Sequence, residues 1–349
     1  MAANAFADGV FDATLGYFKI WSMYLGLRLG LYEALGEAGL TADQVAARAE
    51  IDPRYAREWL EQQATIGVLR ADVSQDPPVF HLPEDAAESL LDPDSLSYLG
   101  ATIRQLASLR AVIDPVADAF TTGDGVAPER FGTESADGQG ASNRPVYLTT
   151  LPDRWLPHIE PFHAKLGSGA TRVIDIGCGH GWSSIALARA YPEAVVDGFD
   201  PDEHSIAAAR LHAEEAGVGD RVRFHAVDGA TIDATADLAM AFECVHDMPN
   251  PVQVLGAARR ALPEDGAMLV VDERVGERFE GTPHELESYF YGWSIFDCLP
   301  AGRSATPSAA TGTVMRPDTL RGYAEEAGFT RFEILPIEHD VFRLYLLRP

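Results

Sequence analysis

Cysteine and basic side chains are both scarce in this chain of 349 residues. Its 3 cysteines, Cys178, Cys244 and Cys298, lie far apart and show no C-x-x-C spacing. This distribution excludes a cysteine zinc motif, so we expect no metal site, and it predicts free thiols in a reducing cytoplasm. Lys and Arg number 27 against 53 Asp and Glu, which gives a net charge of −26. A phosphate backbone or an anionic membrane would be repelled, so neither nucleic acid nor a membrane is an expected partner.

A leader segment and a long uninterrupted apolar run are also missing. The first residues, MAANAFADGVFD, contain no basic region and no cleavage pattern, which argues against secretion. The most apolar stretch, 15–35, is interrupted by Lys19, Arg28 and Glu33 and is a poor membrane span. As a helix it is apolar almost all round, so we expect it to be buried against its own chain or against a partner.

The stretch that organises the chain is 172–200, RVIDIGCGHGWSSIALARAYPEAVVDGFD. Its pattern predicts, in order, a buried parallel strand over 173–176, a glycine turn over 177–181, a helix over 182–191 and a strand over 195–199. The second strand delivers Asp200 to the carboxyl edge of the sheet, where open α/β folds bind their ligands.

The glycine spacing separates two classes of cofactor. A dinucleotide site requires G-x-G-x-x-G, but here the third glycine comes one residue early and Trp182 holds its place. The pattern G-x-G-x-G, preceded by Asp175, resembles motif I of class I S-adenosylmethionine-dependent methyltransferases. The resemblance implies an α/β fold with a Rossmann-like seven-stranded methyltransferase sheet, and S-adenosylmethionine as cofactor.

The resemblance also assigns cofactor contacts. The glycine turn passes the methionine part of the cofactor, Asp175 helps to hold its amino end, Asp200 accepts hydrogen bonds from the ribose, and Asp228 accepts one from the adenine amino group. The full set of expected cofactor residues is Asp175, Gly177, Gly179, Gly181, Asp200, Asp228, Gly229 and Phe242. The three carboxylates in this set arrive at one edge of the sheet on successive strands, an order that is hard to obtain by chance.

The remaining strands and helices complete the expected sheet. Strands are predicted over 222–227, 237–242, 267–271, 331–335 and 342–347, and helices over 201–216, from 251 onward and over 317–327. The last two strands form the terminal hairpin on which the resembled sheet ends.

The N-terminal part predicts a mostly helical winged-helix domain. Helices are expected over 30–35, 41–49 and 53–65, with wing strands over 68–70 and 79–82. This pattern resembles DNA-binding regulators, but Glu58 and Glu61 share the third helix with Arg54 and Arg57, and this balance disfavours a DNA reader. The same fold is the dimerisation cap of plant-type small-molecule O-methyltransferases. That resemblance implies a homodimer with Tyr17, Phe18, Trp21 and Tyr24 at the interface.

We therefore expect three parts: a winged-helix dimerisation domain over 1–100, a helical connector over 101–164, and a methyltransferase domain over 165–349. Within the connector, the Gly-, Ser- and Asp-rich stretch 123–143 predicts a mobile loop.

The fourth strand of this domain ends in FECVHDMPNPVQVL, the stretch with the most chemistry. His246-Asp247 resembles the His-Asp pair of the plant-type O-methyltransferases, in which the histidine is the general base. Imidazole titrates near ~6.5, so neutral His246 would accept a hydroxyl proton close to physiological pH. Glu273 is expected to orient it, as a carboxylate does in the resembled family.

Aromatic residues predict the wall of a small-molecule pocket. Thr282 and Glu285 form a capping box that predicts the start of an aromatic helix. The expected substrate residues are Tyr147, Tyr289, Trp293 and Phe296.

The expected function is methylation of a small hydroxylated or aromatic acceptor by a cytoplasmic homodimer. Two alternatives remain: a winged-helix regulator that keeps the fold as a sensor of S-adenosylmethionine, and an enzyme of the same fold with non-methyl chemistry. A third idea places Cys244 and Cys298 beside the methyl donor as soft nucleophiles, as in arsenite methyltransferases.

Overall fold

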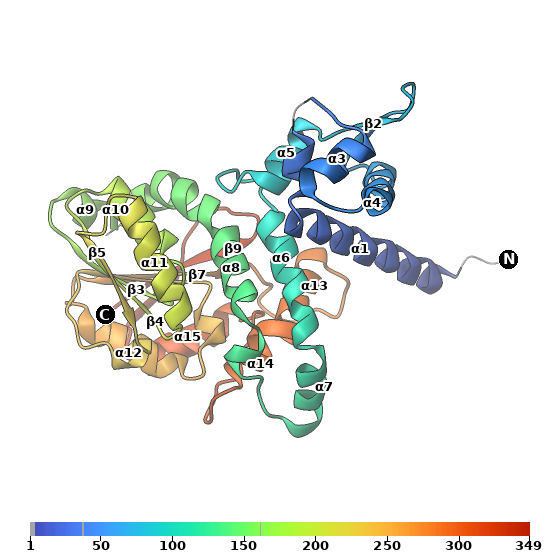
Figure 1. Ribbon diagram of the computed structural model, residues 1–349. Coiled ribbons are helices and arrows are strands. Elements are labelled where there is room, and N and C mark those ends of the chain that lie inside the picture. Colours follow the sequence, from blue (N-terminus) through green and yellow to red (C-terminus); the bar gives the residue numbers. More distant parts are fainter. Residues whose placement is uncertain (1–3, 37, 161) are drawn as a thin grey trace. The chain divides into compact units, whose positions relative to one another are not determined.

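The computed structural model describes residues 4–36, 38–160 and 162–349, and the chain divides into two compact units (Figure 1). These are Met1–Ala107 and Ser108–Pro349, so the expected connector over 101–164 is split between them. Across the described ranges, no helix is both long enough and apolar enough to traverse a bilayer.

Within the described residues, the N-terminal unit contains six helices and one hairpin, and the last helix ends one residue past the unit's boundary. They are α1 (Ala5–Arg28), α2 (Leu31–Leu35), α3 (Ala42–Ala49), α4 (Pro53–Thr65), β1 (Arg70–Asp72), β2 (Val79–His81), α5 (Glu84–Leu91) and α6 (Gly100–Ser108). Gly30 has a left-handed backbone, with φ +65°, and separates α1 from α2. Thr41 and Gln44 form a capping box at α3, and Asp52 caps α4. The winged-helix order is confirmed, although the first wing strand begins two residues later than predicted.

A small core holds this unit together. Tyr32 is fully buried, and its hydroxyl donates to Oε1 of the equally buried Gln63 at 2.6 Å. Trp59 packs edge-on against Tyr32 and donates its indole N–H to the Ser22 carbonyl at 2.9 Å. Tyr24 is only 5% exposed in the same core. Most of the Tyr24 ring therefore packs inside its own unit, which leaves little of it for the dimer interface that we expected there.

The C-terminal unit contains a seven-stranded sheet with the order β5-β4-β3-β6-β7-β9-β8. Its strands are β3 (Arg172–Ile176), β4 (Val195–Asp200), β5 (Val222–Ala226), β6 (Leu238–Phe242), β7 (Ala267–Glu273), β8 (Arg331–Ile334) and β9 (Phe342–Arg348). The first five are parallel, and β9 runs antiparallel to both β7 and β8. The chain order reverses direction at β3, so the carboxyl ends of β3 and β6 form the switch point where this architecture binds ligands.

Helices cover both faces of the sheet. One face packs on α10 (Trp182–Ala190) and α11 (Glu203–Glu215), and the other on α12 (Pro251–Ala261) and α15 (Pro317–Glu326) (Figure 1). Consecutive residues of a strand alternate between the two cores: Val173 lies in the first and Ile174 in the second. This alternation follows from the two-residue period of a strand and explains why the parallel strands are apolar on both faces.

The stretch 123–143 is largely helical, which corrects our prediction of a mobile loop. It contains η2 (Pro128–Arg130) and most of α8 (Thr133–Pro145). Helix α8 contacts α10 and α11, and Gly140 lies so close to the His180 ring that an added Cβ would be 2.5 Å from it. Packing against the domain thus stabilises a helix whose Gly- and Ser-rich composition disfavours it locally.

Shorter helical segments connect these elements. They are η1 (Leu109–Ala111), α7 (Ile113–Thr122), η3 (Val146–Trp155), η4 (Leu156–His158), α9 (Phe162–Gly167), η5 (Gly229–Thr231), η6 (Val245–Asp247), α13 (Glu285–Trp293), η7 (Ser294–Cys298) and α14 (Leu299–Gly302). The predicted capping box at Thr282 is wrong, because α13 begins at Glu285. Its cap is His284, whose Nδ1 accepts the Glu287 N–H at 3.2 Å.

Candidate active site

The glycine turn between β3 and α10 uses its three alternate glycines differently. Gly177, Gly179 and Gly181 have φ values of +67°, +48° and +80°. An added Cβ would lie 2.6 Å from Cys244 Sγ at Gly177 and 2.5 Å from the Phe224 ring at Gly181. At Gly179 it would enter open space, with nothing within 4 Å. Two of the glycines therefore serve close packing, and Gly179 keeps the space above the turn free.

Two carboxylates fix this turn. Asp200 Oδ2 accepts the Gly179 N–H at 3.0 Å, and burial raises the pKa of this carboxyl. Asp175 is 1% exposed, and its Oδ2 accepts the hydroxyls of Ser183 and Ser184, both at 2.6 Å. Asp175 thus positions the first turn of α10, which is a supporting role that the sequence did not reveal.

The other expected cofactor residues line the same edge of the sheet. Asp228 follows β5, is exposed and caps η5 through the Ala230 N–H at 2.8 Å. Gly229 is buried where a Cβ would lie 2.9 Å from Ile176 and from Val254. Phe242 ends β6, with its ring centroid 5.6 Å from that of Tyr147.

This edge fits S-adenosylmethionine by its shape and by its acceptors. The open space at Gly179 leaves room for a ligand against the backbone of the turn. Each oxygen of Asp200 accepts one backbone N–H, from Gly179 or from Asp202, and keeps a second lone pair for a ribose hydroxyl.

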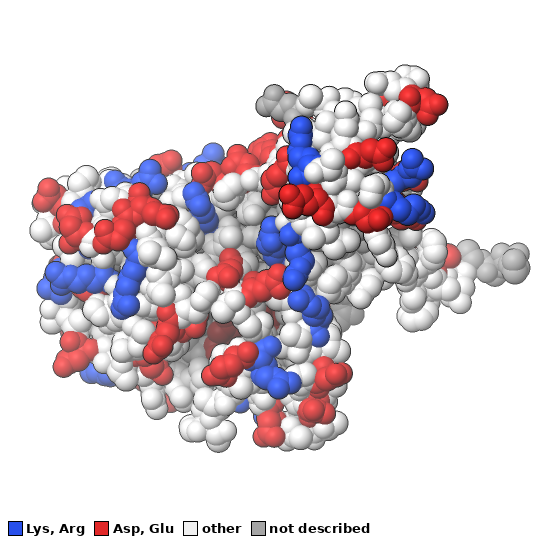
Figure 2. Space-filling view, in the orientation of Figure 1, with Lys and Arg blue, Asp and Glu red and all other residues white. Residues whose placement is uncertain are grey.

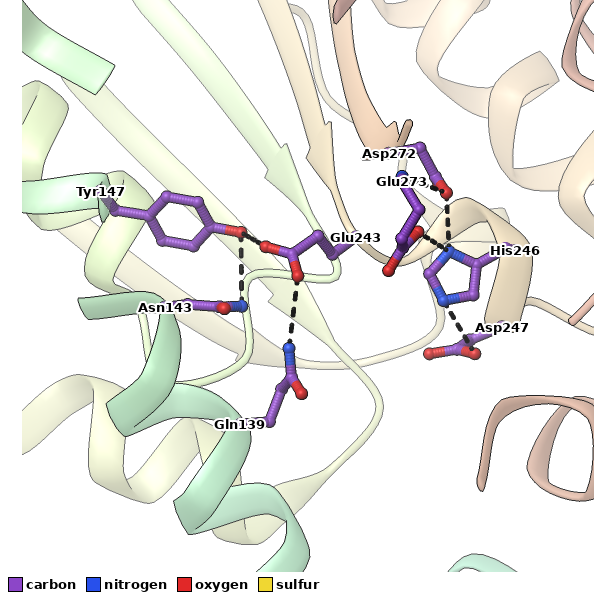
Figure 3. A network of polar contacts seen from close by, with 8 residues as sticks. All are labelled: Gln139, Asn143, Tyr147, Glu243, His246, Asp247, Asp272 and Glu273. Carbon is purple, nitrogen blue, oxygen red and sulfur yellow. Dashed lines mark hydrogen bonds and ion pairs between the residues drawn. The ribbon is translucent and has the colours of Figure 1, made fainter. Parts of the chain in front are cut away.

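His246 lies just beyond β6, surrounded by carboxylates (Figure 3). It is 3% exposed, and its Nδ1 is 2.9 Å from Asp272 Oδ1 and 3.2 Å from Glu273 Oε2. Its Nε2 is 3.3 Å from Asp247 Oδ1. Both ring nitrogens therefore face anionic groups from the ends of β6 and β7.

These charges change the expected protonation state of His246. Burial alone would lower its pKa, but Glu273, Asp247 and Asp272 together outweigh burial and raise the pKa of His246 well above its usual value. This shift disfavours the neutral imidazole that we expected near physiological pH. The reason is that three carboxylates from two segments surround one ring.

The pKa values of neighbouring carboxyl groups are raised as well. Burial raises the pKa of Glu273 to about 7 and, together with the charge of Glu273, raises that of Glu243 to about 8. Burial also raises the pKa of Asp297 to about 7. These groups titrate around neutral pH, where a carboxylate can accept a proton from a substrate.

Glu243 forms a second polar contact beside His246 (Figure 3). Its Oε1 accepts the Tyr147 hydroxyl at 2.6 Å, and its Oε2 accepts from Gln139 Nε2 at 3.5 Å. The Tyr147 oxygen also accepts from Asn143 Nδ2 at 3.4 Å. Glu243 has φ +51°, a strained backbone for a residue with a side chain, and such strain is typical of functional sites.

The expected substrate residues separate into two groups. Tyr147 is 6% exposed and bound to Glu243, so its hydroxyl belongs to the polar network. Tyr289 and Phe296 are 48% and 36% exposed, and Tyr289 packs edge-on against Trp293 at 6.0 Å. Burial raises the pKa of Tyr289, and the charges of Glu243 and Glu273 raise it further.

Burial also raises the pKa of the Cys244 and Cys298 thiols well above their ordinary value. Both stay protonated at neutral pH, and Cys244 Sγ donates to the Ile176 carbonyl at 3.2 Å. The idea of a thiolate pair facing the methyl donor is therefore disfavoured.

The sequence pointed to His246, Asp247 and Glu273, but it did not reveal Glu243 and Asp272 as further members of this site. The signal for Asp272 was present, since Asp272-Glu273 follows β7 directly. Nothing local indicated that Glu243 pairs with Tyr147, because these residues are 96 positions apart.

The fold and this edge of the sheet define a class I methyltransferase-type domain, and comparison with known proteins agrees. Residues 168–302 match the methyltransferase-domain family, and residues 21–91 match the Rv2258c-like winged HTH domain. The chain is 26% identical to the N,N-dimethyltransferase OxyT of Streptomyces rimosus, over 78% of this chain and 80% of that protein. It is 28% identical to the phenazine O-methyltransferase PhzM of Lysobacter antibioticus, over 74% and 76% of the two chains.

A solved structure shows the same fold over both units. Human N-acetylserotonin methyltransferase, in complex with S-adenosylmethionine, matches with a TM-score of 0.73 at 17% identity, over 99% of this chain and 98% of that one. The chain is an S-adenosylmethionine-dependent methyltransferase with an N-terminal winged helix-turn-helix domain, and it methylates a small-molecule acceptor.

The glycine turn gives a first prediction. Gly179→Ala should weaken S-adenosylhomocysteine binding at least roughly tenfold while lowering the free energy of unfolding by about 1–2 kcal/mol, the strain of a left-handed alanine. Gly181→Ala should mainly destabilise, by a further ~1–3 kcal/mol, because its Cβ would overlap the Phe224 ring. Calorimetric titration and urea unfolding measure the two effects. Unchanged affinity in folded Gly179→Ala would contradict the role of the open space.

The buried carboxylates give a second prediction, about pH. The pKa of Glu243 rises from 4.5 to about 8 on folding, so between these values the folded state holds a proton that the unfolded state has lost. Stability should therefore fall as pH rises from 5 to 8, and Glu243→Gln should remove up to ~1.4 kcal/mol per pH unit of that slope. Urea unfolding across this range is the measurement, with the exposed Glu325→Gln as control. An unchanged slope in Glu243→Gln would refute the assignment.

Proposed function

We propose that the acceptor atom is a hydroxyl oxygen and that His246 and Glu273 together handle its proton. The observation that carries this proposal is the His246 network at the switch point of the sheet, on the strand next to the glycine turn. S-adenosylmethionine supplies a methyl group on a cationic sulfur. As the acceptor oxygen bonds to the methyl carbon and the sulfur–carbon bond breaks, the hydroxyl proton must pass to a basic group.

The basic group in this proposal is the pair rather than a free imidazole. In this proposal His246 carries a proton between its carboxylates, because their charges raise its pKa. The Glu273 carboxylate, with a pKa of about 7, is ionised often enough to accept the hydroxyl proton and close enough to His246 to share it. The imidazolium lowers the pKa of Glu273 and keeps it available as a base.

A second candidate acceptor is an amine. Within the described residues, buried Asp272 Oδ2 accepts no hydrogen bond, and buried Asp247 Oδ1 and Glu273 Oε2 have only their ion pairs with His246. An ammonium or amine group has the donors to satisfy them. The name of the relative OxyT, an N,N-dimethyltransferase, is consistent with this alternative.

An acceptor panel distinguishes the two candidates. Catechols, hydroxyphenazines and hydroxylated polyketides should release S-adenosylhomocysteine, and matched aromatic amines should not. Turnover of the amines alone would replace the hydroxyl proposal, whereas binding of S-adenosylmethionine without turnover of any compound would favour a sensor. A DNA-binding regulator would need a continuous basic surface. On the face shown in Figure 2, Lys and Arg are interspersed with Asp and Glu, which disfavours the sensor alternative.

The proton-handling pair gives the third prediction. His246→Ala should lower kcat by roughly 10²–10⁴ while leaving S-adenosylhomocysteine affinity within about twofold, because the ring acts on the acceptor and not on the cofactor. Glu273→Gln should lower kcat and shift the acidic limb of the pH–rate profile. The measurements are initial rates against pH and calorimetric titration. Unchanged kcat in His246→Ala would remove its role and leave the cofactor site intact.

We further propose that the protein is a cytoplasmic homodimer joined through α1. This helix exposes a series of apolar side chains: Phe6, Val10, Phe11, Leu15, Tyr17, Phe18 and Leu25. Beside them, residues of α1 and α4 line a groove of about 940 Å³. A second copy of α1 is the occupant that we propose, because an apolar surface of this extent is otherwise unfavourable in water. The three free cysteines are consistent with a reducing compartment.

The fourth prediction concerns this interface. Phe11 and Phe18 are 63% and 60% exposed, and changing both to Asp should convert a dimer into a folded monomer. Light scattering after gel filtration gives the mass, and circular dichroism checks the fold. Tyr55→Asp, at a 77% exposed position on α4, should stay dimeric. A wild-type monomer, or a dimer that survives the double substitution, would contradict the proposal.

A further inference from the structure

We propose that Asp137, His180 and His204 form a binding site for a divalent transition metal such as Zn²⁺, which ties α8 to the glycine turn. The three residues come from separate segments of the C-terminal unit: Asp137 from α8, His180 from the turn and His204 from the first turn of α11. Their ligand atoms all lie within 4.8 Å of one another. None of them belongs to the His246 network.

The ligand atoms lie near the spacing of a shared ion, with a direct hydrogen bond between His204 and Asp137. Asp137 Oδ1 is 2.7 Å from His204 Nε2 and 3.6 Å from His180 Nε2. Zinc binds imidazole nitrogen and carboxylate oxygen at about 2.0–2.2 Å, which places neighbouring ligand atoms of a tetrahedral site roughly 3.3 Å apart. Small side-chain shifts would bring all three atoms to such distances. Two imidazoles and one carboxylate favour zinc or a similar ion over Mg²⁺ or Ca²⁺, which prefer oxygen ligands.

His180 is the strongest indication of a missing ligand. Its ring is 8% exposed, and its buried Nε2 forms no hydrogen bond within the described residues. A buried ring nitrogen without a partner is unfavourable, and a metal ion would satisfy it.

The surroundings hold the ligands while leaving room for water. Gly140 allows α8 to pack directly on the His180 ring. The His180 carbonyl accepts from His212 Nδ1 at 3.1 Å, which helps to orient the turn. The side chains of His204 and Asp137 are 41% and 53% exposed, so water can complete the coordination.

The proposed metal site adjoins the glycine turn, so a bound ion would affect cofactor binding. His180 lies between Gly179 and Gly181, and α8 also carries Gln139 and Asn143 of the polar network. A metal that joins Asp137 to His180 therefore ties the turn that faces the cofactor to the helix beside it. We expect the bound ion to slow cofactor release. The cysteine spacing led us to expect no metal site. The proposed site uses no cysteine, and its His and Asp ligands come from distant positions in the sequence.

The test begins with metal binding alone. The full-length protein is stripped with EDTA and titrated with Co²⁺, followed by its absorption, and with Zn²⁺, followed by calorimetry. We expect one ion per chain, without a thiolate charge-transfer band. His204→Ala and Asp137→Asn should each weaken Zn²⁺ binding more than roughly tenfold. His225→Ala is the matched control, because His225 pairs with Asp197 at 3.0 Å and no third metal-ligating side chain joins them in the described part of the chain.

Three results would overturn the proposal. They are no stoichiometric binding by the wild type, equal binding by the wild type and both ligand variants, or a thiolate band that places the ion at Cys298 and His246. Stopped-flow release of S-adenosylhomocysteine then tests the consequence. Zn²⁺ should slow release at least twofold in the wild type and in His225→Ala but not in His204→Ala, and equal release rates would refute the link to α8. No acceptor is needed, so failure here is distinct from failure of the proposed methyl transfer.

Discussion

The hydrogen bond from the Gly179 N–H to Asp200 Oδ2 is the contact on which the cofactor edge depends. It joins the turn after β3 to the end of β4, so two neighbouring parallel strands fix one loop. Asp175 secures the other side of that loop through Ser183 and Ser184 at the start of α10. Because both carboxylates are largely removed from water, their bonds are strong and their loss would leave buried donors unpaired. The turn is thereby fixed in the shape that keeps Gly179 open.

Much of this region could be predicted from sequence because its determinants are local. The β-branched residues of β3, the alternate glycines and the acid at the end of β4 lie within 29 consecutive positions of the chain. Helix α8 could not be predicted, since its Gly- and Ser-rich sequence disfavours a helix and only packing on α10 and α11 stabilises it. Likewise, Thr282 has the pattern of a cap, but His284 is the residue whose side chain reaches the free N–H.

The candidate site shows the same division between local and distant information. His246 could be found from its place after β6, and Glu273 from its place at the end of β7. The charge on His246 could not be found, because it depends on how closely Asp247, Asp272 and Glu273 approach the ring. The pKa of Glu273 depends in turn on the charges of His246 and Asp272. The sequence identifies the titratable side chains, but the distances between them decide which one holds the proton.

The acidity of this site has an energetic consequence for the fold. Burial raises the pKa of Glu243, Glu273 and Asp297, so their ionised forms are less favourable in the folded chain than in water. The imidazolium of His246 offsets part of this unfavourable energy for Glu273, and the Tyr147 hydroxyl does so for Glu243. What remains is a set of carboxylates that exchange protons near neutral pH. A more stable arrangement, with every carboxylate fully paired, would leave none of them free to take a proton from an acceptor.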